Sequence, residues 1–326
     1  MRTFWSVLKN NYLRSIPRLT SITFITIITM ATMVLAIYIT GLQEVKGHVV
    51  FITNQPKEVV NNHSKHLDIT VSDKKPPRSD LVKQKYDAFI TIDDNGHYQI
   101  ESLRNKEFKK MVITLLENPD IDIKEISPQR GVGVNIVGFM MMFLLLISFS
   151  NLFGFADDKE QGQLKRITAA PASFGGYLWA HCVYCITIFL PEYLLLIIMK
   201  DLGFRIGFSL LEYGGIMVVL AFFGISVGLI LNTLIQKPDN AMMFGNSIMI
   251  LTCVLSGSFY SFTKNNEVLD RILMFLPQKE FMDFVEHMQD HNQWEHVGSL
   301  LYIIVFSIIL FVLSCMLLRQ KYVKRV

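Results

Sequence analysis

The sequence is poor in charged residues and has only four cysteines. Charged residues make up 18% of the 326 positions, whereas 51% are hydrophobic, and the mean hydropathy is +0.35. A soluble domain of this length carries more charge, so the composition excludes an ordinary soluble protein and indicates an integral membrane protein. The cysteines all lie in apolar segments, which indicates packing and not a disulfide framework. They are Cys182, Cys185, Cys253 and Cys315.

Enzyme signatures are also missing. The sequence contains no G-x-x-x-x-G-K-[ST] phosphate loop, no H-E-x-x-H, no G-x-S-x-G and no dinucleotide-binding fingerprint. The histidines that could hold a metal lack a matching set of cysteines or carboxylates. We therefore expect no catalytic residue, no metal site and no cofactor bound by this chain. The histidines in question are His63, His66, His287, His291 and His296.

Long apolar runs are what the sequence does contain. About 20 helical residues are needed to cross roughly 30 Å of hydrocarbon. Six segments are long enough, and Glu192 is the only acidic residue within them. The predicted spans are residues 19–41, 132–155, 177–199, 214–235, 241–262 and 297–318.

Basic residues near both ends of the chain predict its orientation. Lysine and arginine concentrate on the cytoplasmic side of membrane spans, so both termini are predicted to be cytoplasmic, which agrees with an even number of spans. This topology places residues 43–130 outside the cell and residues 157–176 in the cytoplasm. The basic residues are Arg2, Lys9, Arg14 and Arg18 before the first span, and Arg319, Lys321, Lys324 and Arg325 after the last.

Residues 1–18 predict a short amphipathic helix in the inner membrane interface. Phe4, Leu8 and Tyr12 recur every four residues, and Lys9 and Arg14 are placed to reach lipid phosphates. An irregular basic tail is the alternative. Residues 19–42 are predicted as a retained first transmembrane helix, because the apolar core is longer than that of a signal peptide and no A-x-A-like cleavage site follows it.

Residues 43–130 predict a small extracellular α/β domain. Four segments have the pattern of strands, and Asn95-Gly96 is typical of a turn between the last two. A helix is plausible at residues 56–65, and another is predicted at residues 105–117, where Phe108 and Val112 share a face with Met111 and Leu115. The predicted strands are residues 48–54, 67–73, 86–94 and 97–103. The predicted fold class is thus an α-helical polytopic membrane protein with six transmembrane helices and this α/β domain between the first and the second, with residues 131–326 forming a five-helix transmembrane region.

A charged segment, "DDKEQGQLKRITAAP", separates two of the apolar runs at residues 157–171. Its acidic start and basic end complement the dipole of a short helix, which Gly162 would weaken and Pro171 would end. A solvated connector is the alternative, but it would need neither this order of charges nor the apolar Leu164. We predict a cytoplasmic helix within residues 157–170.

The same segment resembles a known family, the type-2 permeases of ATP-binding-cassette (ABC) transporters. Those membrane subunits typically have six spans, in one subgroup with a large external domain after the first. The cytoplasmic segment between their second and third spans has an E-x-G-x-L-x-R-x-x-x-x-P-like pattern. In this sequence the pattern is carried by Glu160, Gly162, Leu164, Arg166 and Pro171, and the resemblance continues through Leu255-Ser256-Gly257 and Leu276-Pro277. "PQKEFMDFVEHM", residues 277–288, departs from the proline-aromatic sequence that is usual in the family.

The resemblance implies that residues 157–166 form a coupling helix that docks on a separate ABC ATPase. It implies two copies of that ATPase, which would bind ATP and Mg²⁺, and a second permease, the same or homologous. The remaining expected partner is the lipid membrane, and no nucleic acid is expected. The location implied is a bacterial cell membrane, crossed several times. The predicted coupling residues are Asp157, Asp158, Glu160, Gly162, Leu164, Lys165 and Arg166.

Polar residues within the predicted spans are candidates for a translocation path. Glu192, Asn135 and Asn246 are the ones we select, although proximity to the outer interface would also explain Glu192. Gly224 and Gly228 form a small-xxx-small pattern that favours close helix packing within the subunit.

The predicted function is a permease that exports a hydrophobic or amphipathic compound, such as a drug, an antimicrobial peptide or a lipid. Six spans and small cytoplasmic loops favour transport. One alternative is a membrane-anchored sensor or interaction protein whose external domain binds a ligand. The other is an ion extruder of the same family.

Overall fold

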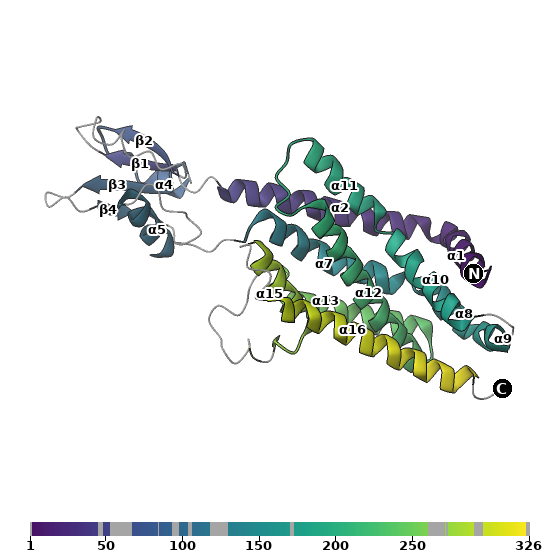
Figure 1. The fold of residues 1–326 in the computed structure, drawn as a ribbon. Coiled ribbons are helices and arrows are strands. Elements are labelled where there is room, and N and C mark those ends of the chain that lie inside the picture. The colour runs from purple at the N-terminus through teal and green to yellow at the C-terminus, as the bar shows by residue number, and fades with distance from the viewer. Residues whose placement is uncertain are drawn as a thin grey trace. The chain divides into compact units, whose positions relative to one another are not determined.

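The computed structural model describes most of the chain as helices, with one small sheet (Figure 1). It divides into two compact units, which are considered separately. The helical unit comprises Met1–Ile37 and Gly131–Val326, and the sheet unit comprises Tyr38–Arg130. The described residues are 2–44, 48–52, 67–83, 85–92, 98–103, 106–117, 130–169, 173–259, 271, 273–289 and 296–323.

Five helical segments are long and apolar enough to cross a membrane, judged over the described residues. They coincide with five of the six predicted spans and extend beyond them at most ends, since the apolar windows continue into more polar helical turns. They are Thr3–Thr40, Val132–Glu160, Phe174–Asp201, Leu210–Leu234 and Val297–Tyr322. The protein is therefore a polytopic membrane protein.

The predicted span at residues 241–262 corresponds to α13, Pro238–Leu255. This helix has 18 residues and is not among the five segments, because its first turns carry Asp239 and Asn240 and its middle carries Asn246. Residues 256–259 form a turn, and residues 260–262 lie outside the described residues. Six spans therefore remain a prediction.

Two of the long segments are interrupted next to a proline. The first consists of α1 (Arg2–Ser15), a short 3₁₀ turn at Ile16–Arg18 that contains Pro17, and α2 (Leu19–Glu44). The third consists of α10 (Phe174–Thr187) and α11 (Leu190–Asp201), which begins with Pro191 in its first turn. Proline has no backbone N–H to donate inside a helix, but it fits the first turn of one. Each of the two segments therefore begins a new helix close to its proline.

The core of the helical unit is built around α12 (Leu210–Leu234), which packs on α7 (Val132–Ser150) and α16 (Val297–Leu318). Gly224 and Gly228 face α7, as predicted for packing within the subunit. A Cβ atom on Gly224 would lie 2.7 Å from the Cβ of Ser148, and one on Gly228 would collide with Leu152. At Gly224, only glycine allows α12 and α7 to approach this closely.

The sheet unit contains four strands in the order β2-β1-β3-β4, at the places where four strands were predicted. The strand β1 (His48–Ile52) pairs in parallel with β2 (Asp68–Ser72) and β3 (Ala88–Ile92), and β3 pairs antiparallel with β4 (Tyr98–Glu101). The predicted Asn95-Gly96 turn and the helix at residues 56–65 lie outside the described residues.

Both faces of this sheet are covered. Val49 and Phe51 form one cluster with Val112 and Leu115 of α5 (Lys106–Glu117), whereas Val50 of the same strand forms another with residues of the opposite face. Successive side chains of a strand point to opposite faces, so a strand buried on both faces is apolar throughout. The second cluster contains Leu81, from the short helix α4 (Ser79–Val82), and Phe89.

Candidate functional site

The charged segment folds as two short helices joined by a glycine turn. The first, α8, covers Phe153–Glu160 and the second, α9, covers Gln163–Ala169. Gly162 between them has a φ of 68°, in the left-handed region that glycine adopts without strain. The single helix predicted within residues 157–170 is therefore interrupted, and residue 170 lies outside the described residues.

Asp158 of α8 points into the helical unit and is buried. Its Oδ1 lies 2.6 Å from Nη1 of Arg14, and its Oδ2 accepts a hydrogen bond of 2.8 Å from the hydroxyl of Tyr177. These partners come from α1 and α10, respectively. A buried carboxylate needs such partners, so Asp158 joins α8 and α10 to α1, which is far from both in the sequence. Arg14 thus pairs with Asp158, and its predicted contact with lipid phosphates stays a prediction.

Asp157 is less enclosed than Asp158. Its Oδ2 lies 3.4 Å from Nη2 of Arg18, and the two side chains are 34% and 45% exposed. Arg18 also lies over the ring of Phe153, with 4.1 Å between the guanidinium carbon and the ring centroid. Two consecutive acidic residues of α8 therefore both contact the junction between α1 and α2.

Further polar contacts fasten α1 to α10. Asn11 hydrogen bonds through Nδ2 to Nδ1 of His181 at 3.1 Å, both side chains being buried, and the hydroxyl groups of Tyr12 and Thr187 also pair. Leu8 belongs to the same apolar cluster as Leu164 and several residues of α10. α1 is therefore a packed part of the helical unit, and its depth relative to a membrane stays a prediction.

Lys159 connects the charged segment to α12. Its Nζ donates hydrogen bonds to the carbonyl oxygens of Asn232 and Ile235, at the C-terminal end of that helix. Unpaired carbonyl groups and the helix dipole both favour a cation at this position. The lysine therefore anchors α8 on the central helix of the core.

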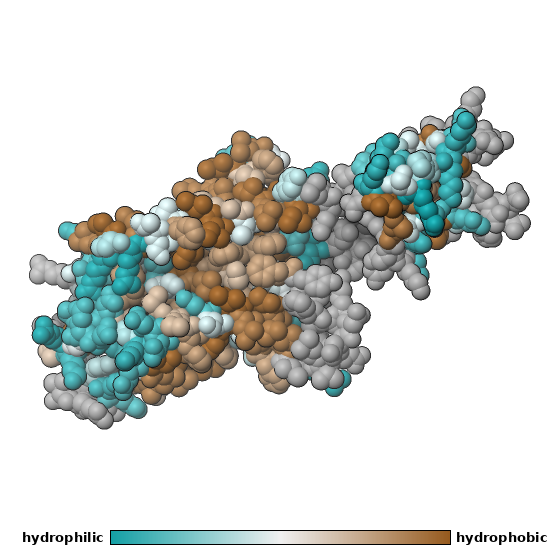
Figure 2. Space-filling view, turned by 180° about the vertical axis from the view of Figure 1, so that it is seen from behind, coloured by the Kyte–Doolittle hydropathy of each residue, from teal (hydrophilic) through white to brown (hydrophobic). Residues whose placement is uncertain are grey.

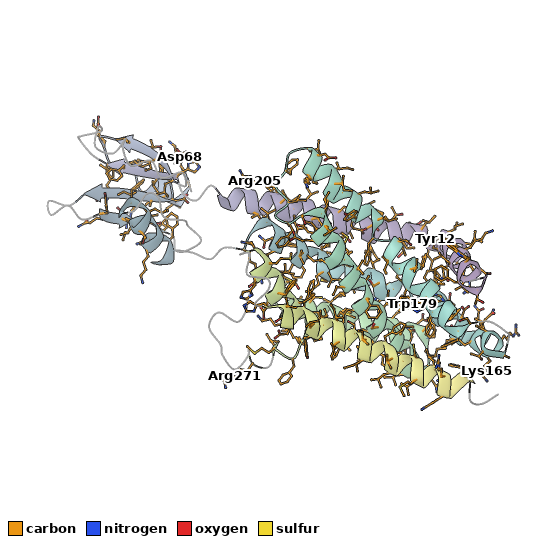
Figure 3. All side chains as sticks on the ribbon, in the orientation of Figure 1. Tyr12, Asp68, Lys165, Trp179, Arg205 and Arg271 are labelled. Carbon is orange, nitrogen blue, oxygen red and sulfur yellow. The ribbon has the colours of Figure 1, made fainter. Side chains whose placement is uncertain are left out.

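The remaining charged residues around the glycine turn point outward. Glu160, Lys165 and Arg166 are exposed, whereas Leu164 is fully buried beside Tyr322. Figure 3 labels Lys165 on α9, and Figure 2 shows hydrophilic surface gathered at this end of the helical unit, next to a broad hydrophobic surface. The predicted coupling residues thus separate into a buried set and an exposed set.

The two sets were not distinguishable in the sequence. Asp157, Asp158 and Leu164 hold the segment in place, Gly162 forms the turn, and Glu160, Lys165 and Arg166 form what we call the outward surface. Arg14, Lys159 and Tyr177 were missed as partners. No local signal identifies them, because Arg14 and Asp158 are 144 positions apart.

The three predicted path residues lie on three different helices. Glu192 lies in the first turn of α11 and is fully buried; no hydrogen bond of ordinary geometry reaches its carboxylate oxygens within the described residues, although Thr26 of α2 faces it. Asn135 belongs to α7 and Asn246 to α13, and both are partly buried. α7 and α13 pack on each other. Glu192 is thus a polar site between α11 and α2, separate from the α7 and α13 pair.

Of the histidines considered as metal ligands, two lie in the described part of the chain. His287 and His296 stack with 3.4 Å between ring centroids, and Nδ1 of His287 lies 2.7 Å from the carbonyl oxygen of Asp283. His63, His66 and His291 lie outside the described residues.

Comparison with known proteins places the chain in a family. Residues 17–316 match the model of the ABC-2 family transporter proteins, so the chain belongs to this family of ABC transporter membrane subunits. A relative is the linearmycin resistance permease protein LnrN of Bacillus subtilis (strain 168), which is 20% identical over 195 residues. That alignment covers 59% of this chain and 50% of the relative, so the match spans half the length of the relative. No solved structure matches the chain.

Proposed function

We propose that this chain is the permease subunit of an ABC exporter whose ATP is hydrolysed by a separate subunit. The observation that carries the proposal is the outward surface, Glu160, Lys165 and Arg166, on a segment whose other charged residues are anchored in the helical core. A surface that binds a partner must be exposed, and a segment that transmits movement to other helices must be firmly attached to them. The segment has both properties.

The anchoring explains how a movement would be transmitted. A partner that pushes on the outward surface displaces α8, and α8 is joined to α1 and α10 through Asp158 and to α12 through Lys159. Small displacements at one surface become movements of whole helices when the helices are rigidly connected. We propose that two ATPase copies act in this way on two permease subunits.

The proposed cargo is a hydrophobic or amphipathic compound. Glu192 is the only acidic residue in the predicted spans, and it is buried between helices. A path for small ions would normally be lined by more charge. The name of the Bacillus relative, a resistance permease, supports export of such a compound.

Copurification tests the partner, and matched variants test the surface. The full chain is expressed with its host's ABC ATPases and purified in mild detergent, as wild type, Glu160→Ala and Arg166→Ala. The controls are Asp201→Ala and Lys200→Ala, which remove the same kinds of exposed charge at the end of α11. We expect an ATPase to copurify with wild type and both controls and to be retained up to about fivefold less by the two outward variants, since each lost ion pair is worth up to about 1 kcal/mol.

Three results would each contradict a part of the proposal. If no protein with a Walker motif copurifies with wild type, the permease assignment loses its basis, and a sensor becomes the better hypothesis. If the outward variants retain the ATPase and drive transport as wild type does, the surface assignment is wrong. Stimulation of hydrolysis by inorganic ions alone, with no response to amphipathic compounds, would indicate an ion extruder.

A further inference from the structure

A cavity of about 780 Å³ opens between the start of α16 and the segment that leads into α15 (Pro277–Gln289). It lies within the helical unit and shares no residue with the outward surface. Figure 3 shows Arg271, one of its lining residues, at the end of the helical unit away from Lys165. Polar and apolar side chains contribute to the lining, among them Arg271, Met274, Phe275, Glu280, Ser299 and Tyr302.

The walls of this cavity are fixed by hydrogen bonds between elements. Ser299 of α16 donates a bond of 2.6 Å to Oε2 of Glu280, and the hydroxyl of Tyr302 donates one of 3.1 Å to the carbonyl oxygen of Phe275. On its other side, α15 is held to α13 by a bond of 2.8 Å from Nε2 of Gln278 to the hydroxyl of Thr252. The carboxylate of Glu280 is therefore oriented by the fold.

The position of the cavity indicates the kind of molecule it meets. α16 is an apolar helix long enough to span a membrane, and the cavity lies at its first turns. The ends of spans lie where hydrocarbon gives way to lipid headgroups, and aromatic side chains are frequent at this level. Phe275 is 78% exposed and Met274 is 48% exposed, so both offer apolar surface beside the polar groups.

Both signs of charge line the cavity. Arg271 is exposed, and its guanidinium suits the oxygens of a phosphate. Glu280 presents a carboxylate, which suits a primary ammonium group but repels an anion. A headgroup that carries a phosphate and an ammonium a few bonds apart would satisfy both residues. A purely anionic headgroup would satisfy only Arg271.

We propose that this cavity binds phosphatidylethanolamine. Its phosphate contacts Arg271, its ammonium contacts Glu280, and its acyl chains run along Met274, Phe275 and Tyr302. The proposal does not depend on the ATPase or on the cargo. A lipid bound here would hold α15 against α16 at the edge of the helical unit.

Native mass spectrometry of the full chain tests this proposal. The protein is released from micelles that contain equal amounts of phosphatidylethanolamine, phosphatidylcholine and phosphatidylglycerol with the same acyl chains. The variants are Glu280→Gln, which can still pair with Ser299, and Arg271→Gln. Arg205→Gln is the matched control, since Arg205 is exposed, lies between α11 and α12, and does not line the cavity.

We expect wild type and Arg205→Gln to retain phosphatidylethanolamine about three- to fivefold better than phosphatidylglycerol, the size of effect of a partly exposed ion pair. Phosphatidylcholine should fall between them, because its quaternary ammonium has no N–H to donate. Glu280→Gln should lose the preference for phosphatidylethanolamine over phosphatidylcholine, and Arg271→Gln should retain less of both. Equal retention of the three lipids by wild type would overturn the proposal. So would an unchanged preference in the two variants, or an equal loss in Arg205→Gln.

Discussion

In α16 the apolar side chains point in every direction, whereas in α5 they lie along one face. Leu301, Val305 and Ile309 of α16 are each 51% exposed, although the helix also contributes the buried Ile303 to the core. In α5 the buried Phe108, Val112 and Leu115 share a face, and Lys110 is exposed on another. A helix that is apolar all round is buried in a protein core or in lipid, whereas a helix with one apolar face presents its other face to water or to a polar interface. The two units are thus built for different solvents.

The ion pairs of the two units differ in how exposed their side chains are. In the helical unit, Asp158 is 7% exposed and pairs with Arg14 across 144 positions of the sequence. In the sheet unit, Glu101 pairs with Lys75 and Arg78, whose side chains are 57% and 77% exposed. The Arg14–Asp158 pair therefore joins two helical elements in one unit, whereas the pairs of Glu101 involve exposed side chains in the other.

The largest expected effect comes from placing a charge on each exposed apolar surface. Ile309→Arg puts a guanidinium near the middle of α16, where insertion into a bilayer costs about 2.5–3.5 kcal/mol. Val82→Arg makes the same change at a position that is 71% exposed in the sheet unit, and it should change stability by less than about 0.5 kcal/mol. The measurement is the amount of full-length protein in the membrane fraction, with Ile309→Val as the control. Equal amounts of Ile309→Arg and Val82→Arg would show that the exposed apolar surfaces of the two units do not face different solvents.

A smaller effect is expected from removing one partner of the buried ion pair. Asp158→Ala leaves the hydroxyl of Tyr177 without its acceptor and leaves Arg14 with a bond of 3.4 Å to the carbonyl oxygen of Gly154. The change should destabilise the helical unit by about 1–3 kcal/mol, since Arg14 can also partly reach water. A thiol-reactive dye measures this, because Cys182, Cys185 and Cys253 are buried in the helical unit.

The controls for this experiment are Asp157→Ala and Glu101→Ala. The pair of Asp157 with Arg18 is longer and more exposed, so its loss should cost at most about 1 kcal/mol. The sheet unit has no cysteine, so Glu101→Ala should leave the midpoint of dye labelling unchanged. If Asp158→Ala and Asp157→Ala have the same midpoint, Asp158 does not hold the helical elements together.

The smallest expected effect is a difference in pH dependence between the units. Burial raises the pKa of Asp283 in α15 above the ordinary value of 3.8 despite its contact with Lys279, whereas the hydrogen bond from Lys75, aided by Arg78, lowers the pKa of Glu101 below 4.5. A raised carboxyl pKa means that the folded state binds more protons, so stability is lost as pH rises through the interval above 3.8. A lowered carboxyl pKa has the opposite sign, and stability is lost as pH falls below 4.5.

Two neutral variants isolate these contributions. Relative to Asp283→Asn, wild type should lose stability of the helical unit as pH rises, as measured by dye labelling. Relative to Glu101→Gln, the sheet unit of wild type should be cleaved faster by an acid-active protease as pH falls. Differences that do not change with pH, or that have the reverse sign, would show that these carboxyl groups do not distinguish the two units.

Much of the fold could be predicted because its signals are local. Apolar runs of sufficient length indicated five helical segments that the structure contains, and short runs rich in β-branched and aromatic residues indicated the four strands. The Gly224 and Gly228 spacing indicated close packing, which the contact of α12 with α7 confirms. The predicted span at residues 241–262 is not among these five segments, because α13 contains Asp239 and Asn246 among its apolar residues.

The sequence by itself determined that this is a membrane protein of the ABC-2 family, and it located the charged segment between two apolar runs. Only the tertiary structure decided that Asp158 faces inward and Glu160 outward. Both are acidic residues of one short helix, so the sequence does not distinguish them. Their roles depend on partners of α8 such as Arg14, Tyr177 and the end of α12. Those partners are brought to α8 by the packing of helices distant in sequence, and no local pattern encodes which side of α8 they will meet.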